Sequence, residues 1–327
     1  MNTEQADLIL NAWDQGLDQF SVYSSGSTGT PKEIVLERKW MKWSAEQTGK
    51  VFDVKPSDKM YCCLPVDKVG GLMMLIRSKV WQIPIQVVEP SSNPLLEAVD
   101  ASIISLTAYQ IHNVLMNPIS VEHLKLFRIV LIGGGDISSV LETQIQKLPE
   151  SCEVYHSYGM SETYSHIALR QMNGRDRSDW FTRFEGIEIQ VGDLGNAIIK
   201  TPYYTEALST NDRIELNDKN QFRILGRLDF VINSGAFKQQ PEEIERLIQR
   251  KLNLPVNFVI SSTQDEALGE KLVLVCEDKS SFEKMDFSFL KQLNAFAIPK
   301  EIIQVNELPL NSGGKIDRKS VRELINN

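Results

Sequence analysis

The chain has 327 residues, of which 42% are apolar and 24% charged, a composition typical of a globular protein with a sizeable core. Acidic residues outnumber basic ones by 43 to 35, and the net charge of −8 argues against a general nucleic-acid-binding protein. No apolar stretch approaches the ~20 residues of a membrane span, and the N-terminus lacks the basic and apolar regions of a signal peptide. Four cysteines without disulfide or metal-site spacing favour reduced thiols and a cytoplasmic protein.

From the N-terminus to about residue 176, short apolar runs alternate with helical patterns. A first helix is predicted over residues 3–19, with Leu8, Trp13 and Leu17 near one face. This alternation favours a mainly parallel sheet that is covered by helices on both faces. The predicted strands are 20–24, 60–65, 83–89, 101–106 and 126–134, and the further helices are 38–52, 71–81, 107–116 and 138–148.

After residue 176 the pattern changes to short strands, over 187–191, 196–200 and 222–227, which predict a small antiparallel subdomain. A helix over 240–252 then begins with Pro241 and two glutamates, a good helix N-terminus. Strands over 257–262, 271–277 and 300–305 and a helix over 288–294 predict a small α+β domain. The sequence therefore predicts an α/β protein with domains at 1–228 and 229–327.

The stretch SSGSTGTPK, residues 24–32, has the composition of a phosphate-binding loop. Its glycines permit tight turns and close approach to an anion, and its hydroxyl groups and lysine supply donors. It is not a Walker A loop, because Pro31 precedes the lysine, and it is not GxGxxG. A plain Gly/Ser hairpin turn is the alternative. The candidate phosphate-binding residues are Ser24, Ser25, Gly26, Ser27, Thr28, Gly29 and Lys32.

This stretch resembles the phosphate loop of the superfamily of acyl-CoA synthetases, adenylation domains and luciferases, and further motifs follow in the family's order. The resemblance implies an enzyme that activates a carboxylate with ATP. In SYGMSET, residues 157–163, it implies that Tyr158 stacks on adenine, that Ser161 contacts phosphate and that Glu162 holds Mg²⁺, with Gly159 in the same motif. The alternative is a helix start capped by Ser161.

Two further motifs resemble nucleotide-binding motifs of this family. In LIGGGD, residues 131–136, the resemblance places Gly133, Gly134 and Gly135 against the adenine and the acyl group. In STNDRIEL, residues 209–216, it implies that Asp212 binds the ribose hydroxyls, although Asn211 stands where the family has glycine. For LIGGGD, an ordinary turn at the end of a strand is the alternative.

The C-terminal part carries two more family motifs. In RILGRLDFVINSGAF, the resemblance implies that Arg227 contacts ribose or phosphate, that Asp229 is the hinge between domains and that Gly235 lines a coenzyme A tunnel. In LPLNSGGKIDR, Lys315 would be the catalytic lysine of adenylation, reaching the carboxylate and the α-phosphate. Lys32 would hold the β- and γ-phosphates. Surface turns and a solvated charge are the alternatives.

Two local matches resemble the o-succinylbenzoate–CoA ligases of menaquinone synthesis, a short branch of the family. LPVDKVGGLMMLIRS, residues 64–78, has Lys68 where these relatives have histidine, but it keeps their arginine as Arg77. ISLTAYQI, residues 104–111, is the second match. Their substrate has two carboxylates, so we expect Arg77 or Lys68 to pair with the one that does not react, with Gly134 lining the same site. A surface helix arginine is the alternative for Arg77.

Three functions remain open at this point: an o-succinylbenzoate–CoA ligase, which we favour, another aryl- or acyl-CoA ligase or carrier-protein loader, and a non-catalytic nucleotide-binding module. The first implies ATP, Mg²⁺ and coenzyme A, together with a small carboxylic acid that is an aromatic diacid. No nucleic-acid partner and no membrane insertion are expected, and a homodimer is left open.

Overall fold

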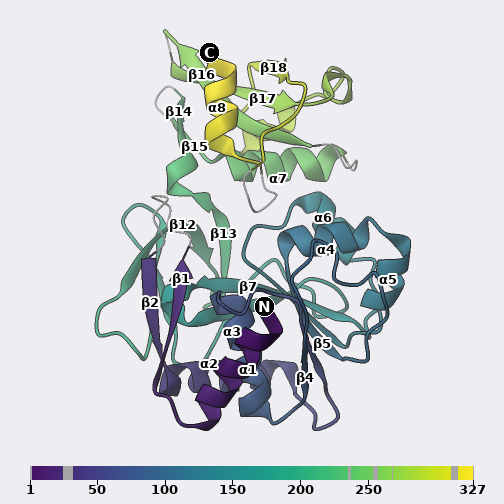
Figure 1. The fold of residues 1–327 in the computed structure, drawn as a ribbon. Coiled ribbons are helices and arrows are strands. Elements are labelled where there is room, and N and C mark those ends of the chain that lie inside the picture. Colours follow the sequence, from purple (N-terminus) through teal and green to yellow (C-terminus); the bar gives the residue numbers. More distant parts are fainter. Residues whose placement is uncertain are drawn as a thin grey trace.

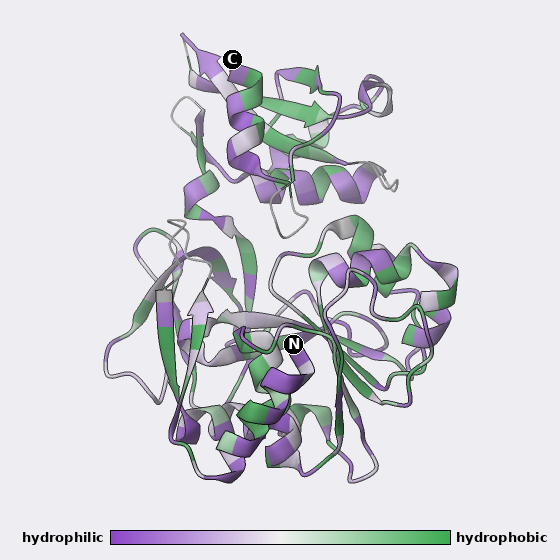
Figure 2. Cartoon of the chain, in the orientation of Figure 1, coloured by the Kyte–Doolittle hydropathy of each residue, from purple (hydrophilic) through white to green (hydrophobic). Residues whose placement is uncertain are grey.

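The computed structural model describes residues 2–24, 32–234, 237–252, 257–266, 268–310 and 316–326. Figure 1 shows a large sheet with helices on both sides, followed by a smaller sheet with α7 (Pro241–Leu252) and α8 (Arg318–Asn326) beside it. In Figure 2 many strand residues inside the sheets are hydrophobic, whereas the helices alternate between the two colours. This alternation is typical of helices that bury one face and expose the other.

The largest sheet has seven strands in the order β4-β3-β5-β6-β7-β8-β9. Neighbouring strands from β4 to β7 are parallel, and β8 and β9 continue the sheet in antiparallel pairs. The prediction of a mainly parallel sheet is therefore confirmed. The strands are β3 (Met60–Cys62), β4 (Ile85–Val87), β5 (Ile103–Thr107), β6 (Ile129–Gly133), β7 (Glu153–Met160), β8 (Ser165–Gln171) and β9 (Thr182–Arg183).

Both faces of this sheet are buried, as its uninterrupted apolar runs predict. Cys62 packs in a core with side chains of α1, α2 and α3, whereas Tyr61 and Cys63 pack in a second core with side chains of α4, α5 and α6. Successive side chains of a strand point to opposite faces, so the helices must cover both. They are α1 (Asn2–Asp14), α2 (Arg38–Phe52), α3 (Val69–Trp81), α4 (Ala108–Leu115), α5 (Pro118–Leu124) and α6 (Ser139–Ile145).

A hairpin and a four-stranded antiparallel sheet complete this part. In the hairpin of β1 (Gln19–Ser24) and β2 (Lys32–Glu37), Ser24 pairs with Lys32, so SSGSTGTPK connects two antiparallel strands. The four-stranded sheet confirms the three predicted strands and adds β12, whose many polar residues hid it in the sequence. Its strands are β10 (Glu188–Val191), β11 (Asn196–Lys200), β12 (Leu208–Leu216) and β13 (Phe222–Arg227).

The C-terminal elements form a separate sheet with its own core. The two strands predicted over 257–262 and 271–277 pair as β16 and β17, in antiparallel directions, and β18 lies parallel to β17. Ile244 and Ile248 of α7 and Val321 of α8 are fully buried against this sheet. The division into domains at 1–228 and 229–327 remains a prediction. The strands are β14 (Ile232–Ser234), β15 (Phe237–Gln239), β16 (Phe258–Asp265), β17 (Gly269–Cys276) and β18 (Glu301–Gln304).

Some predicted details are wrong. α1 ends at Asp14, and Leu8 and Leu17 are 70% and 49% exposed, so only Trp13 of the predicted apolar face is buried. Residues 288–292 form a 3₁₀ helix, and α5 and α8 were not predicted. Among the described residues, no helix combines the length and the apolar character that crossing a membrane requires.

Candidate active site

Two of the predicted motifs lie next to each other at the carboxyl ends of β6 and β7. These strands are parallel neighbours, with Ile132 opposite His156. β6 ends at Gly133, and Gly134 follows with a φ of +74°, a conformation that L side chains rarely adopt. Ligands of parallel α/β sheets bind beyond the carboxyl ends of the strands, so this edge is suited to a nucleotide.

Gly159 is the position in SYGMSET that leaves no room for a side chain. A Cβ atom there would lie 2.2 Å from the carbonyl oxygen of Ser165 and 2.4 Å from Cα of His166. The register of β7 and β8 also shifts between Tyr158 and Gly159. The glycine therefore allows β8 to approach β7 closely, directly beside the residues that carry the motif.

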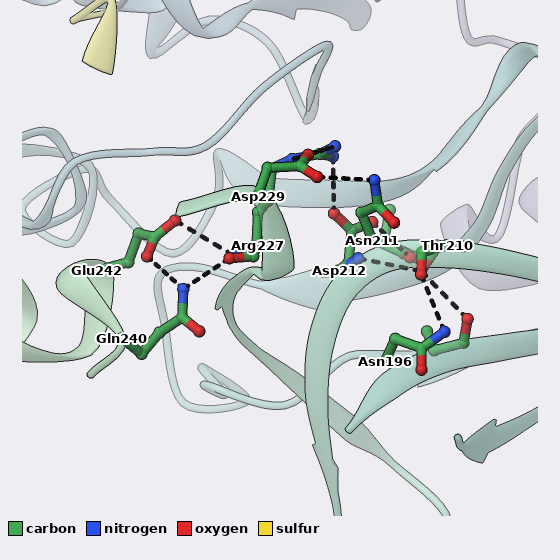
Figure 3. A network of polar contacts seen from close by, with 10 residues as sticks. Asn196, Thr210, Asn211, Asp212, Arg227, Asp229, Gln240 and Glu242 are labelled. Atoms are coloured by element: carbon green, nitrogen blue, oxygen red, sulfur yellow. Dashed lines mark hydrogen bonds and ion pairs between the residues drawn. The ribbon is translucent and has the colours of Figure 1, made fainter. Parts of the chain in front are cut away.

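Three residues from three separate motifs meet at one carboxylate. The Tyr158 hydroxyl donates to Oδ2 of Asp212 at 2.9 Å, and Arg227 Nη1 donates to Oδ1 of Asp212 at 3.1 Å. Asp212 and Arg227 face each other across β12 and β13, as Figure 3 shows. The fold thus brings together the three side chains to which the sequence assigned adenine and ribose contacts.

Tyr158 is held rigidly in this arrangement. Its side chain is only 7% exposed and packs edge-on against Phe222 and Phe181, with ring centroids 5.1 and 6.1 Å away. Burial, together with the charge of Asp212, raises the pKa of Tyr158 far above its ordinary value. The phenol therefore stays protonated and donates its hydrogen bond at any physiological pH.

The carboxylate of Asp229 is bound from two sides in the same network (Figure 3). Arg227 Nη2 donates to Oδ2 at 2.6 Å, and Asn211 Nδ2 donates to Oδ1 at 2.9 Å. Burial alone would lower the pKa of Arg227, but the hydrogen bond with Asp229 and the charge of Asp212 raise it on balance. Asn211 therefore ties β12 to the residue that we predict to be the hinge.

The start of α7 holds the main chain next to Asp229. Glu242 Oε1 accepts from the Arg227 N–H at 3.2 Å, and Gln240 Nε2 donates to the Arg227 carbonyl at 3.0 Å. Gln240 Oε1 in turn accepts from Arg213 Nη1 at 2.9 Å. A Cβ atom on Gly226 would come within 2.4 Å of Gln240 Nε2, so the approach is close. The segment before Asp229 is therefore in direct contact with α7.

Ser161 and Glu162 begin a short 3₁₀ helix, residues 161–163, after β7. Both are partly exposed, and neither side chain is bonded to another described residue. The alternative of Ser161 as a helix cap is not met, because the N-cap position is Met160. Within the described residues no cluster of three or more metal-ligating side chains exists. A single carboxylate such as Glu162 fits Mg²⁺ that takes its other ligands from phosphate and water.

Arg77 is buried in α3 without a carboxylate partner among the described residues. It is 2% exposed, and Nη2 donates to Ser165 Oγ at 2.8 Å and to His166 Nδ1 at 3.3 Å, while Nε has no hydrogen-bond partner. Burial lowers the pKa of Arg77 to about 9, so it stays charged at neutral pH. Burial and the charge of Arg77 lower the pKa of His166 well below its ordinary value, so this neighbour is neutral.

Lys68, the other candidate for substrate binding, lies in a different environment. It precedes α3, its side chain is 50% exposed, and Nζ donates to the carbonyl of Tyr23 at 3.3 Å and lies 3.6 Å from Asp67 Oδ2. A solvated ammonium with an acidic neighbour has no need of a ligand carboxylate. Of the two cations, only Arg77 is buried and lacks a compensating charge within the described chain.

Several predicted site residues lie outside the described residues: Ser25, Gly26, Ser27, Thr28, Gly29, Gly235 and Lys315. For Ser24 and Lys32 the structure describes the backbone alone. Their predicted roles in phosphate binding, catalysis and the coenzyme A tunnel stay predictions. Conversely, the sequence interpretation missed Gln240, Glu242 and His156. A weak signal existed for His156, because residues two apart on a strand share a face and Tyr158 was already a candidate.

Comparison with known proteins decides the family. A family model described as AMP-binding enzyme matches residues 19–191, which is more than half of the chain. The chain belongs to the AMP-binding enzymes. An acyl-CoA synthetase (AMP-forming)/AMP-acid ligase II-like protein from Dyadobacter fermentans is 31% identical, with 99% of this chain and 94% of that chain covered and a TM-score of 0.65.

Two further relatives of this AMP-binding enzyme are informative. The 2-succinylbenzoate–CoA ligase of Listeria monocytogenes serotype 4b is 28% identical over 98% of this chain and 73% of its own length. The o-succinylbenzoate coenzyme A synthetase of Bacillus subtilis, solved in complex with ATP and magnesium ion, is 20% identical, with coverage of 91% and 68% and a TM-score of 0.66. The latter similarity establishes the adenylate-forming fold, which confirms the predicted fold class.

Proposed function

We propose that this protein is an ATP-dependent, AMP-forming ligase that joins 2-succinylbenzoate to coenzyme A, a step of menaquinone synthesis. The observation that carries the proposal is the meeting of Tyr158, Asp212 and Arg227 at one carboxylate, beside the glycine turn of β6. A non-catalytic nucleotide-binding module would have no need to keep this arrangement together with a buried Arg77 that has no carboxylate partner among the described residues. The curated relatives that share this activity support the choice of acid.

In the first half-reaction, an oxygen of the acid's carboxylate attacks the α-phosphorus of ATP, and the bond to pyrophosphate breaks. The Asp212 carboxylate would accept hydrogen bonds from the ribose hydroxyls, because each of its oxygens has a lone pair beyond those used by Tyr158 and Arg227. Ser161 and Arg227 would contact phosphate. Glu162 would hold Mg²⁺, which would supply positive charge against the phosphate oxygens. Lys32 and Lys315 would add two positioned cations.

The acid site is proposed around Arg77. A buried guanidinium without a counter-charge is costly, and it gains most from a ligand carboxylate. Nη2 is held by Ser165 and His166, which fixes the side chain before the substrate arrives. The reacting carboxylate has to face the nucleotide, so the second carboxylate of an aromatic diacid would be the group that pairs with Arg77.

In the second half-reaction, the coenzyme A thiol loses its proton, its sulfur attacks the adenylate carbonyl, and AMP leaves. Rotation about Asp229 would remove Lys315 and bring the Gly235 segment to the site. The contacts of Asp229 with Arg227 and Asn211 would have to change during that rotation. Four cysteines that are free and buried support a reducing, cytoplasmic location.

The choice of acid is tested with pyrophosphate release from ATP in the presence of Mg²⁺, coenzyme A and different acids. We expect kcat/KM for 2-succinylbenzoate to exceed that for 4-phenyl-4-oxobutanoate, which lacks the ring carboxylate, by about 30-fold or more, because the second acid leaves the buried cation unpaired. Benzoate and a short fatty acid serve as further comparisons. Equal kcat/KM for the diacid and the monoacid would rule out recognition of a second carboxylate.

A further inference from the structure

His156 holds the carbonyl group of Gly135 in the glycine turn that follows β6. The ring Nε2 lies 3.1 Å from the Gly135 carbonyl oxygen, and the imidazole is 6% exposed. His156 lies on β7, two residues before Tyr158, so one short strand segment reaches both the turn and the Tyr158–Asp212 contact. The side chain that fixes the turn therefore comes from the neighbouring strand and not from the turn itself.

The second nitrogen of this imidazole determines which tautomer is present. Arg170 Nε lies 3.3 Å from His156 Nδ1, and a guanidinium can only donate. In this contact Nδ1 accepts, which leaves Nε2 as the ring nitrogen that carries the proton. This places an N–H opposite the Gly135 carbonyl, which can only accept. Arg170 thus sets His156 in the one form that can hold the turn.

Arg170 is itself fixed by an ion pair with the helix that follows the turn. Its Nη1 donates to Glu142 Oε1 at 2.8 Å, and the two side chains are 10% and 21% exposed. Glu142 lies on α6, seven residues after Gly135. The path Gly135, His156, Arg170, Glu142 therefore starts in the turn, crosses β7 and β8, and returns to the chain just beyond the turn. Both ends of this segment are anchored to the sheet.

Phe181 connects this path to the other half of the site. Its ring centroid lies 5.3 Å from that of His156, 5.5 Å from the guanidinium of Arg170 and 6.1 Å from the ring of Tyr158. Phe181 is 3% exposed, so these contacts are packed. The glycine turn and Tyr158 are therefore fixed relative to one another through shared neighbours.

We propose that His156, set by Arg170 and Glu142, is a positioning residue for ATP that holds the Gly135 carbonyl and with it the turn that receives the adenine. This inference rests on the proposed function, because that function places the nucleotide at the turn. His156 acts through the turn and not on the reacting atoms. Its loss should weaken nucleotide binding and leave recognition of coenzyme A unchanged.

Three variants separate a hydrogen-bonding role from a packing role. His156→Phe keeps a ring against Phe181 but removes the donor to Gly135. His156→Gln keeps one amide N–H for Gly135 and one carbonyl oxygen for Arg170. The matched control is His123→Phe. His123 lies on α5, outside the site, and its Nδ1 makes a similar contact with the Leu95 carbonyl oxygen at 2.9 Å.

The measurement is calorimetric titration of the full chain with ATP and Mg²⁺ in the absence of acid, followed by the KM for coenzyme A. We expect His156→Phe to raise the Kd for ATP by about 3- to 10-fold, the range for losing one hydrogen bond. The Kd values of His156→Gln and His123→Phe should stay within about 2-fold of that of the unmodified protein. The KM for coenzyme A should not change beyond that margin in any variant.

Each outcome decides between the inference and the function. Failure of the unmodified protein to bind ATP overturns both. If the unmodified protein binds ATP and His156→Phe has the same Kd, the positioning role alone is overturned. The same holds if His156→Gln raises the Kd for ATP as much as His156→Phe does. If His156→Phe does not fold, ¹⁵N NMR of histidine-labelled protein still decides, because only four histidines contribute. The inference requires the Nε2–H tautomer for His156, and a proton on Nδ1 contradicts it.

Discussion

Replacing Lys315 with alanine is expected to lower the rate of acyl-adenylate formation by about 10²–10³-fold, the usual cost of removing one preorganised donor from a developing charge. The lysine lies in GGKIDR, and the family resemblance assigns it to the carboxylate and the α-phosphate. This assignment gives it no role once the adenylate exists. Conversion of supplied adenylate to the coenzyme A ester should therefore change far less. Pyrophosphate release and single-turnover thioester formation measure the two steps separately.

Lys319→Ala is the matched control for this experiment. Lys319 lies four residues further along, its side chain is 87% exposed, and it contacts only Glu323, at 4.0 Å, among the ion pairs of the described residues. We expect no more than about a 2-fold effect from its loss, as for most surface charges. Equal losses in both half-reactions for Lys315→Ala, or a comparable loss for Lys319→Ala, would show that the lysine supports the fold and does not act in adenylation.

Arg77→Met should reduce kcat/KM for the diacid by about 30-fold to several thousandfold, because it leaves a substrate carboxylate unpaired in a buried site. This range corresponds to a loss of about 2–5 kcal/mol in transition-state stabilisation. The KM for ATP should change little, since the hydrogen-bond partners of Arg77 are Ser165 and His166 and not the Tyr158–Asp212 contact. Arg77→Lys keeps the charge but not the planar guanidinium group, so its kcat/KM for the diacid should lie between those of the unmodified protein and Arg77→Met. Steady-state kinetics with varied acid and varied ATP give both constants.

Three comparisons keep the Arg77 result interpretable. The monoacid 4-phenyl-4-oxobutanoate should be nearly indifferent to Arg77→Met, which also shows that the variant is folded. Lys79→Met removes another cation of α3, one that pairs with Asp14 at 2.6 Å, and should be neutral. Lys68→Ala tests the alternative cation. If the diacid's kcat/KM survives Arg77→Met and falls only with Lys68→Ala, the substrate carboxylate binds at Lys68 and not at Arg77.

The fold of the large sheet could be predicted because its signals are local. Strands such as β5 and β6 are continuous apolar runs, and the helices between them have clear amphipathic periods. Prediction failed where burial depends on distant neighbours. Leu8 and Trp13 look alike in the sequence, yet only Trp13 meets a partner, Phe20, at 6.0 Å. β12 is recognisable as a strand only when β11 and β13 lie on both sides of it.

The candidate site divides in the same way. Tyr158, Asp212 and Arg227 could be named from the sequence because each lies in a motif with a recognisable family pattern. Their mutual contact could not be foreseen, since it depends on where β7, β12 and β13 end. His156 and Gln240 carry no motif of their own. Their importance comes from a bond to one backbone carbonyl, which only the folded chain defines.

The most direct test of the account is the product formed from 2-succinylbenzoate, ATP and coenzyme A. We expect AMP and the coenzyme A ester to appear in equal amounts by mass spectrometry. Sustained AMP release should require coenzyme A, because a ligase holds the adenylate until the thiol attacks. AMP without a coenzyme A ester, or no turnover of this acid when another acid is turned over, would contradict the central claim that the protein is a 2-succinylbenzoate–CoA ligase.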